Sequence, residues 1–399
     1  MPCKFLQIHS LTSFAASLLN RDDAGFAKRM PFGGAVRTRI SSQCLKRHWR
    51  MYDGENALRS INAPESIRSR ESFERYVVEP LVADGVSVDV ARAATEKIVS
   101  KLLGSEAKKE RIERKAGKKK NVEDTGPGPS DDKVRTPQVT VLGRPELDYL
   151  CQLAREAVRE AGGKTERIDV VIDTKMKSEK FRKNIQALKP GSLEAGLGAA
   201  LFGRMVTGDI LARTDASIHV AHAITVHSQM TESDYFSAID DLVREEGQQE
   251  SGHINASELT SGLFYGYVVV DVNGLVANLG GDSQLAGDVV QKLVRMIPTV
   301  SPGAKRGSTA PYAYSHLLLV ESGNAQPRTF QNAFLDAVRT NGSVIDNAYD
   351  ALAEHIAELD AMYGKAQERA HSGLRTRNRF EGAMTVAELA DWSRQRVVA

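Results

Sequence analysis

Two short segments combine glycines with basic side chains, a combination that suits the binding of phosphate groups. Pro302–Thr309 reads PGAKRGST, so two glycines let the backbone approach a phosphate, two bases supply positive charge and two hydroxyls can donate hydrogen bonds. Phe32-Gly33-Gly34, followed by Arg37 and Arg39, repeats this chemistry. A surface loop with incidental charge is the alternative for each segment alone. The two together favour a nucleic-acid backbone as the ligand.

Positive charge is concentrated near the N-terminus, although the whole chain is balanced, with 53 basic against 51 acidic side chains and a net charge of +2. Between residues 4 and 50 the acidic side chains are Asp22 and Asp23, and the basic ones are Lys4, Arg21, Lys28, Arg29, Arg37, Arg39, Lys46, Arg47 and Arg50. From Thr231 to Glu258 the sign reverses, with acidic side chains in excess. Unless both stretches are ordinary solvated faces, this asymmetry suits a polyanion on one surface and a basic neighbour on another.

Motifs with catalytic potential are weak. Asp22 and Asp23 adjoin Arg21, and such a pair can hold a metal ion or act as a general base in phosphodiester cleavage. No His or Lys stands at a defined spacing from these two aspartates. A role in a turn or in ion pairs with the surrounding bases is therefore the simpler interpretation. Gly163-Lys164-Thr165 lacks the first glycine of a phosphate loop, whose position is occupied by Val158. No GxSxG sequence is present.

The histidines and cysteines do not predict a metal site. On a strand His219 and His222 would point to opposite faces, and roughly 26 Å of extended chain would separate His219 from His227. We therefore expect core or hydrogen-bonding histidines and no cofactor. The three cysteines are odd in number and lack CxxC spacing, which is typical of a protein of the reducing cytoplasm.

The composition is that of a folded chain outside the membrane. With 399 residues, of which 41% are hydrophobic and 26% charged, the chain has room for one large or two ordinary domains, and wholesale disorder is excluded. The first residues lack a continuous apolar run, and the longest apolar runs elsewhere are too short to span a bilayer. We expect neither secretion nor membrane insertion, and a cytoplasmic location.

One predicted helix, Ser42–Met51, presents much of the basic patch. Ser41 and Ser42 offer an N-cap, and Leu45 and Trp49 recur at i and i+4 as an apolar stripe. The side chains that fall mainly away from this stripe are Gln43, Lys46, Arg47 and Arg50. They form either a plain helix surface or, as their charge suits, a surface that binds a ligand.

The remaining elements predict an α+β fold. Strands are predicted at Lys4–Leu11, Val36–Ile40, Ala216–Gln229, Leu259–Val272 and Pro311–Glu321. Further helices are predicted at Glu65–Ala83, Val88–Leu103, Pro145–Ala161, Ser178–Leu188, Ser192–Met205, Tyr235–Glu246, Gln284–Ile297, Phe330–Arg339, Val344–Met362 and Val386–Arg396. The order is that of a βαββαβ sheet with helical insertions.

The segment Gly104–Pro137 differs in composition from its surroundings. It carries eight bases between Lys108 and Lys120, then a Gly-Pro-Gly-Pro run and almost no apolar residue. Such a composition cannot pack a core and predicts a mobile basic insertion.

Several segments resemble, in order, the CasC family of the RAMP superfamily, the crRNA-binding backbone subunits of type I-E CRISPR Cascade. The matching segments are Leu19–Asp23, Phe32–Gly34, Arg37–Gln43, Leu45–Arg47, Gly203–Met205, Ser217–His227, Asp240–Leu242, Ser261–Tyr265 and Pro302–Lys305. The likeness runs from the N-terminus to at least Tyr312 and does not include the basic insertion.

The resemblance implies an RRM-like (ferredoxin-like) palm, a helical fingers insertion and a β-hairpin thumb. The implied divisions are palm at 1–58, fingers at 59–190 with the basic segment 104–137, palm at 191–215, thumb at 216–235 and palm with terminal helices at 236–399. It also implies a non-catalytic subunit that stacks head to tail along one guide RNA, kinks it at regular intervals and supports pairing of the guide with target DNA in an R-loop. The implied partners are crRNA, target DNA, further copies, other Cascade subunits and a recruited nuclease, in antiviral defence.

Site residues are carried over by the same resemblance. Those implied to contact the guide backbone are Arg21, Gln43, Lys46, Arg47, Arg50, Lys305 and Arg306, and Met205 is implied to wedge against the kinked RNA. The thumb is implied around 222–234, with His222, Thr225 and His227.

Two rival classes remain open. An RNA-cleaving RAMP backbone subunit would use Asp22 or Asp23 with a metal ion. A free-standing RRM-like regulator would show an RNP1 pattern of stacking aromatics, and the sequence contains none.

Overall fold

The computed structural model describes residues 2–117, 134–136, 138–178, 181, 195–204, 214–239, 251–365, 367–375, 379–380 and 382–398, with the backbone alone for 104–117, 235–239 and 251–256. The chain divides into two compact units. The first unit comprises Met1–Ile61, Ile218–Val272 and Ser283–Ala399, and the second comprises Asn62–Ser217 and Asn273–Asp282. The first boundary lies close to the predicted one at 58, whereas the described residues of 191–215 belong to the second unit.

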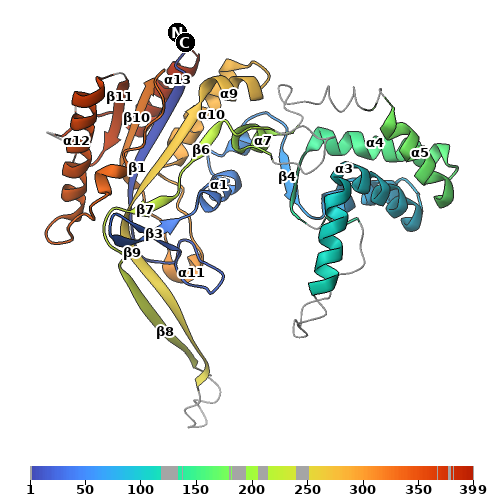
Figure 1. The fold of residues 1–399 in the computed structure, drawn as a ribbon, viewed down its shortest axis with the longest axis horizontal. Helices are drawn as coiled ribbons and strands as arrows, with labels where there is room; N and C mark the ends of the chain where they lie inside the picture. Colours follow the sequence, from blue (N-terminus) through green and yellow to red (C-terminus); the bar gives the residue numbers. More distant parts are fainter. Residues whose placement is uncertain are drawn as a thin grey trace. The chain divides into compact units, whose positions relative to one another are not determined.

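An antiparallel sheet forms the centre of the first unit (Figure 1), in the order β11-β10-β1-β9-β7-β3-β2, with β6 and β8 also paired to β9. Its strands are β1 (Phe5–Ser17), β2 (Arg29–Phe32), β3 (Ala35–Ile40), β6 (Ile218–Val220), β7 (Ala223–Thr225), β8 (Thr231–Ile239), β9 (Ser251–Asp271), β10 (Ser315–Gly323) and β11 (Glu368–Gly373). The central strand β1 pairs with β10 on one side and β9 on the other, so Leu6 lies opposite both Ser322 and Val270.

The two faces of this sheet are covered by different helices because side chains alternate along a strand. Leu11 of β1 packs with Tyr265 and with Tyr349 of α12 (Val344–Tyr363). Phe14 instead lies in a cluster with Phe264, against which Leu45 of α1 (Ser42–Met51) packs. Helix α1 therefore lies on the face opposite α12.

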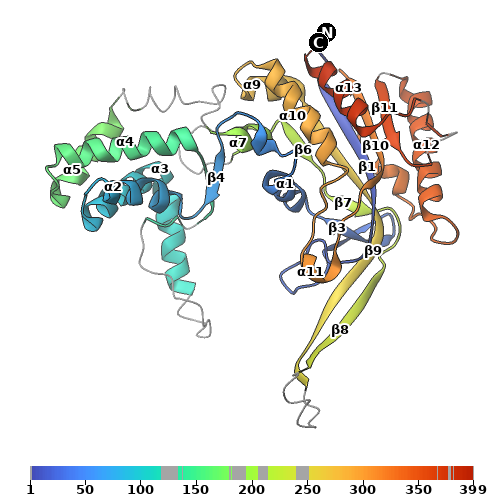
Figure 2. The ribbon, with the colours of Figure 1, turned by 180° about the vertical axis from the view of Figure 1, so that it is seen from behind.

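Helices α10 (Ser283–Met296) and α13 (Val386–Val398) also belong to the first unit and lie side by side, as the view from behind shows (Figure 2). A Cβ at Gly287 would lie 2.5 Å from Val398, so the glycine permits the close approach. Short helical turns lie at η1 (Leu58–Ser60), α11 (Arg306–Thr309) and η3 (Gln331–Phe334).

A long hairpin extends from the sheet and is formed by β8 and the N-terminal half of β9 (Figure 1). Thr231 pairs with Thr260 at its root, and Ile239 pairs with Ser251 at the far end of its described part. The prediction of a helix over Tyr235–Glu246 is therefore wrong in its described residues. The predicted thumb span 216–235 contains β6 and β7, which pair within the sheet, and only the start of this hairpin.

The second unit is mainly helical. Its elements are η2 (Glu74–Val78), α2 (Glu79–Ala83), α3 (Val88–Gly117), α4 (Arg144–Glu160), α5 (Thr165–Lys177), α7 (Leu197–Phe202) and the paired strands β4 (Ser66–Ser69) and β5 (Thr140–Gly143); α9 (Val272–Asn278) begins at the boundary. The core of the unit includes Phe73, Ile98, Leu150 and Ile172. The predicted helix over Glu65–Ala83 is thus wrong at its start, where β4 lies.

The basic insertion is more ordered than its composition predicts. Helix α3 continues past Leu103 to Gly117. At the other end Val134 is fully buried in the core of the second unit, and Thr136 donates its backbone N–H to the carbonyl of Arg70. The prediction that Gly104–Pro137 contributes nothing to a core is therefore wrong at its C-terminal end, where Val134 is buried, and its first residues continue α3.

Two further differences concern the C-terminal third. The predicted helix over Phe330–Arg339 is only the short turn η3, and the strand predicted from Pro311 begins at Ser315. The helices predicted at Gln284–Ile297, Val344–Met362 and Val386–Arg396 are confirmed within two residues at each end. No helix among the described residues is long and apolar enough to cross a membrane.

Candidate nucleic-acid interface

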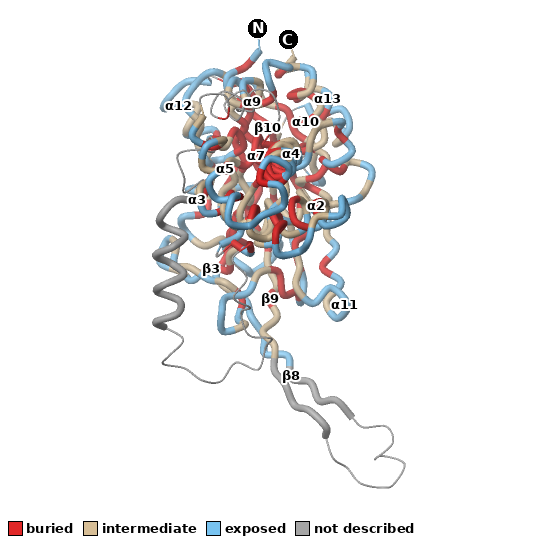
Figure 3. The backbone as a smooth tube through the Cα atoms, turned by 90° about the vertical axis from the view of Figure 1, so that its right-hand side faces the viewer, coloured by how far each residue is buried: buried red, intermediate tan, exposed pale blue. Residues whose placement is uncertain are grey.

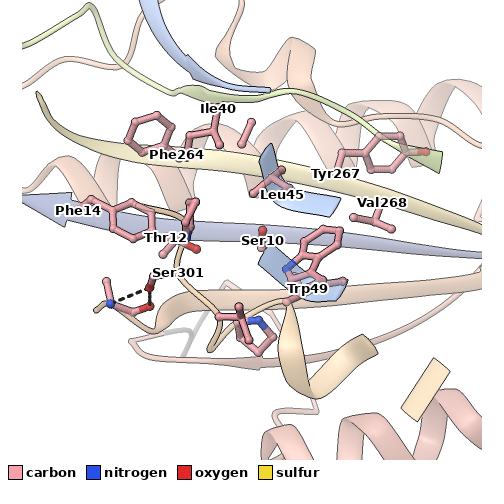
Figure 4. A pocket seen from close by; sticks show the side chains of 17 residues that line it. Ser10, Thr12, Phe14, Ile40, Leu45, Trp49, Phe264, Tyr267, Val268 and Ser301 are labelled. Carbon is pink, nitrogen blue, oxygen red and sulfur yellow. Dashed lines mark hydrogen bonds between the residues drawn. The ribbon is translucent and has the colours of Figure 1, made fainter. Parts of the chain in front are cut away.

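Helix α1 is fixed to the sheet by its apolar stripe. Ser41 caps the helix by accepting a hydrogen bond from the backbone N–H of Cys44, at 3.3 Å. Trp49 is 3% exposed, and with Leu45 it lines a cavity of about 50 Å³ between the helix and the sheet (Figure 4). Because this side is buried, Gln43 and Arg47 are exposed, while Lys46 and Arg50 are half-buried.

The glycine-containing segment after α10 is held against the end of α1. The N–H of Gly303 donates to Nε2 of His48 at 3.4 Å, and the N–H of Ala304 donates to the carbonyl of Leu18 at 2.8 Å. His48 is itself oriented by a 2.8 Å hydrogen bond between its Nδ1 and the carbonyl of Cys44. Lys305 follows in the left-handed region with φ 49°, and both Lys305 and Arg306 are exposed.

The hydroxyls of this segment serve the turn rather than a ligand. Ser308 and Thr309 both donate their side-chain hydroxyls to the carbonyl of Lys305, at 3.2 and 3.0 Å. Their backbone N–H groups donate to the same carbonyl. The expectation that these hydroxyls bind a phosphate is therefore wrong, and the two cations remain as the chemistry of the segment.

The structure brings several of the predicted guide-contacting residues to one hollow in the first unit. The residues that line it come from the segment after β1, from α1 and its N-cap, and from the glycine segment. They are Leu19, Asn20, Arg21, Asp22, Asp23, Gly25, Ser41, Gln43, Cys44, Arg47, His48, Gly303 and Ala304. Arg21, Gln43 and Arg47 thus share a surface with the segment that carries Lys305 and Arg306.

Two histidines that lie close to these cations have lowered pKa values. Burial lowers the pKa of His48, and the charges of Arg306 and Arg47 lower it further. Burial likewise lowers the pKa of His222, with contributions from Arg39, Lys28 and Lys46. Both imidazoles are therefore neutral at pH 7, and the positive charge of the face comes from its arginines and lysines.

His222 also holds one of these cations in place. The Nη1 group of Arg39 donates to Nδ1 of His222 at 3.0 Å, so the guanidinium is held beside β7. We use the name cationic face for Arg21, Lys28, Arg39, Lys46, Arg47, Lys305 and Arg306. Five of these cations act electrostatically on His48 or His222, which places them around one region of the first unit.

Arg37 does not belong to this face. Its guanidinium is fully buried and donates to four carbonyls, those of Phe32, Thr225, Phe334 and Leu335, at 2.9–3.3 Å. A Cβ at Gly33 would lie 1.5 Å from the Leu335 carbonyl oxygen, so this glycine is required by the approach of the chain after η3. The interpretation of Phe32–Gly34 and Arg37 as a second phosphate-binding loop is therefore wrong.

The carboxylate of Asp22 stabilises a turn. Its Oδ1 accepts hydrogen bonds from the backbone N–H groups of Ala24 and Phe26, at 3.0 and 2.9 Å. This is the turn alternative raised by the sequence. Among the described residues, no group of three or more His, Cys, Asp and Glu side chains is arranged to hold a metal ion.

The predicted thumb side chains lie in β7 or within two residues of its ends. Thr225 is fully buried, and its Oγ1 accepts from the N–H of Thr38. His227 is 2% exposed; its Nδ1 donates to the carbonyl of Ser228, and its Nε2 accepts from the N–H of Leu263. Neither side chain is presented to a ligand, whereas His222 is exposed beside the cationic face. Met205 lies outside the described residues.

Two exposed aromatic side chains beside the glycine segment have no counterpart among the sequence-based predictions. Tyr312 and Tyr314 are 73% and 74% exposed. Their signal in the sequence is an aromatic pair at i and i+2 directly after PGAKRGST. The sequence alone gives this pair no role, because only the structure shows that the segment lies at the end of α1.

A known protein family and solved structures match almost the whole chain. A family model described as CT1975-like protein matches residues 6–393. Among solved structures 112 chains match. One is a chain of a "CRISPR RNA-guided surveillance complex, pre-nicking", which is 25% identical with a TM-score of 0.76, over 98% of this chain and 100% of that chain. Another, from a "CRISPR RNA-guided surveillance complex", is 22% identical with a TM-score of 0.65, over 98% and 99%, and supports the fold alone. No curated protein matches.

Proposed function

The chain belongs to the CT1975-like protein family, and on this premise we propose that it is the crRNA-binding backbone subunit of a type I-E-like CRISPR Cascade complex, of the CasC kind. The observation that carries the proposal is the cationic face, on which side chains from α1 and from the glycine segment around Lys305 lie on one surface of the first unit. The full-length likeness to a chain of an RNA-guided complex supports it.

The strand order of the first unit supports an RRM-like palm. Strands β10, β1, β9 and β6 lie side by side, with α1 following β1 and α10 connecting β9 to β10. This is the βαββαβ arrangement of ferredoxin-like folds. In the proposed subunit the helical second unit takes the place of the fingers, and the β8–β9 hairpin takes that of the thumb.

A backbone subunit must hold any guide sequence, so its contacts have to be with phosphates. Arg and Lys contacts to phosphates position a nucleic acid without reading bases, and unpaired guide bases then read target DNA. We propose Arg21, Gln43, Lys46, Arg47, Arg50, Lys305 and Arg306 for this role. Met205 is proposed to wedge against a kink in the guide, as apolar side chains do between bases.

Assembly along a guide requires a heterologous contact between copies, which does not close on itself. Glu232 and Asp234 are exposed at the root of the hairpin, where they could meet basic side chains of the next copy. Glu258, by contrast, is already paired with Arg29 at 2.7 Å. Other Cascade subunits and a recruited nuclease complete the proposed set of partners.

We propose further that the subunit itself does not cut RNA. The alternative, an RNA-cleaving RAMP subunit, would need Asp22 or Asp23 to hold a metal ion or to act as a base. The two backbone N–H groups at Oδ1 of Asp22 support a turn-forming role instead. A complementary RNA incubated with the guide-loaded protein and Mg²⁺ should therefore stay intact; cleavage that Asp22→Ala or Asp23→Ala abolishes would favour the alternative.

Sequencing the RNA that co-purifies with the protein tests the proposed class. We expect repeat–spacer transcripts of many unrelated spacer sequences. Messenger RNA enriched for one short motif would instead identify a sequence-specific regulator and contradict the proposal.

A further inference from the structure

Tyr312 and Tyr314 form a pair of large side chains that the cationic face does not explain. They are separated by one residue in the stretch between α11 and β10. Ala313, between them, is turned inward and packs against the cluster that contains Phe14 and Ile40. The rings on either side of it are both exposed, so the two rings share the outward side.

The backbone that carries the rings is held at several points. Ser301 and Ala313 are joined by two hydrogen bonds of 3.0 Å, from the N–H of Ala313 to Oγ of Ser301 and from that hydroxyl to the carbonyl of Ala313 (Figure 4). The N–H of Tyr312 donates to the carbonyl of Ala310 at 2.7 Å, and that of Ser315 donates to the carbonyl of Pro298 at 2.9 Å. The rings are thus exposed on a fixed support.

The same support brings Arg306 close to the start of the stretch that carries the rings. An ideal Cβ built at Gly303 would lie 2.5 Å from Cγ of Pro311 and 3.6 Å from Cγ of Arg306, so these three residues are in contact where the loop closes. Tyr312 leaves the loop at this point. In Figure 3 the short helix α11, which begins at Arg306, is drawn mainly as exposed.

We propose that Tyr312 and Tyr314 are a stacking platform for unpaired bases of the single-stranded RNA whose phosphates the cationic face binds. Sites for single-stranded nucleic acids combine a cationic track with aromatic side chains, and stacking tolerates any base because each base has a π-face. This inference rests on the proposed function and adds contacts to bases that carry no sequence code.

The test compares a single-stranded oligoadenylate with a ribose-phosphate chain of equal length that lacks bases. The wild-type chain should bind the oligoadenylate more tightly and should quench the fluorescence of 2-aminopurine placed within it. The double variant Tyr312→Leu, Tyr314→Leu should lose about 10- to 100-fold in affinity for the oligoadenylate, bind the two chains alike and lose the quenching. Its salt dependence should be unchanged, because the phosphate contacts remain.

Matched variants separate stacking from other effects. Tyr312→Phe with Tyr314→Phe keeps the rings and should bind as the wild type does. Tyr363→Leu removes another exposed tyrosine, 65% exposed at the end of α12, and should change nothing. The melting temperature should be the same for all variants. If the double leucine variant melts at a lower temperature, Tyr312→Leu and Tyr314→Leu alone are compared with the double phenylalanine variant instead.

Three outcomes would overturn the inference. Unchanged affinity and quenching in the leucine variant would show that bases do not stack there. Reduced self-association of that variant without RNA, with RNA binding intact, would assign the rings to contact with a second copy. If the wild-type chain bound neither oligonucleotide, the proposed function itself would fail and the platform with it.

Discussion

Arg37 and Arg47 have the same chemistry and lie in the same basic stretch, but their surroundings assign them different roles. Arg37 is buried and saturates carbonyls from three segments of the first unit, whereas Arg47 is exposed in the hollow beside Gly303. Burial lowers the pKa of Arg37, which still leaves it charged at pH 7. A charge held in this way stabilises the fold and is unable to bind a phosphate.

We expect Arg37→Ala to lower the free energy of unfolding by about 2–4 kcal/mol, because several buried carbonyls lose a charged donor. Denaturant unfolding measures the change. Arg47→Ala, the matched control, should change it by less than about 0.5 kcal/mol. An unchanged unfolding midpoint for Arg37→Ala, combined with weakened RNA binding, would show instead that Arg37 contacts RNA.

His227 should make the first unit sensitive to acid. Burial lowers its pKa in the folded state, although its hydrogen bond to Ser228 opposes the shift. The unfolded chain then binds the proton more readily, so the stabilising contribution is complete above the unfolded pKa of about 6.5 and is lost as the pH falls below it.

His227→Gln should therefore flatten the dependence of stability on pH between about pH 7 and pH 5, while lowering stability at pH 7. Unfolding midpoints across this range are the measurement. His219→Gln alters an exposed histidine of β6 and should keep the wild-type slope. A slope that His227→Gln leaves unchanged would mean that other groups cause the acid sensitivity.

Elements whose signals are local were predicted well from the sequence. Helix α1 has the predicted bounds because its cap, Ser41, and its apolar stripe lie within a few residues of one another. Strand β8 was mistaken for a helix because its partner in β9 lies about twenty residues further along, as Tyr235 pairs with Ala256. Local periodicity carries no information about that partner.

The candidate site was only partly predictable for the same reason. The chemistry of Arg21, Arg47 and Lys305 could be deduced from residue type. Their proximity depends on the pairing of β1 with β10, more than 300 residues apart in the chain, and on the contact between Gly303 and His48. The burial of Arg37 depends on carbonyls near residue 335, which no local pattern reveals.

The basic segment yields a prediction about the second unit. Residues 118–133 contain one large apolar residue, Val122, so replacing them by a Gly/Ser linker of equal length should leave the melting temperature nearly unchanged. Val134→Ala, just beyond the replaced part, should cost about 1–3 kcal/mol because Val134 is fully buried.

The replaced residues carry four lysines and four acidic side chains and are neutral overall, but three of the lysines, 118–120, adjoin the basic end of α3. Non-specific attraction for DNA should therefore fall at low salt in the linker variant through the loss of this local cluster. DNA affinity equal to that of the wild type would remove the electrostatic role. A large drop in melting temperature would show instead that residues 118–133 support the fold.

At the scale of the whole molecule, the chain separates the sheet of the first unit, next to which the cationic face lies, from a hairpin that extends beyond it. The hairpin pairs β8 with the part of β9 that lies outside the pairing with β1. Binding of the guide backbone and shaping of the guide should therefore be separable functions.

Deleting residues 235–256 and joining Asp234 to Ser257 by Asn-Gly tests this separation. These two residues are already paired, and Asn-Gly favours the turn that a two-residue hairpin needs. The ion pair between Arg29 and Glu258 is kept. We expect an unchanged melting temperature and RNA affinity but a featureless footprint on bound guide; a retained periodic footprint would exclude the hairpin as the element that kinks RNA.

The central claim is that the cationic face holds RNA by its phosphates. Its most direct test is the affinity of Lys46→Ala with Arg47→Ala for several unrelated RNA sequences over a range of salt concentrations, with Arg394→Ala, whose arginine pairs with Asp288 on α10, as the control. The account predicts an equal loss for every sequence and a salt slope shallower by about 0.7 for each phosphate contact removed. A loss confined to particular sequences, or unchanged affinity, would contradict it.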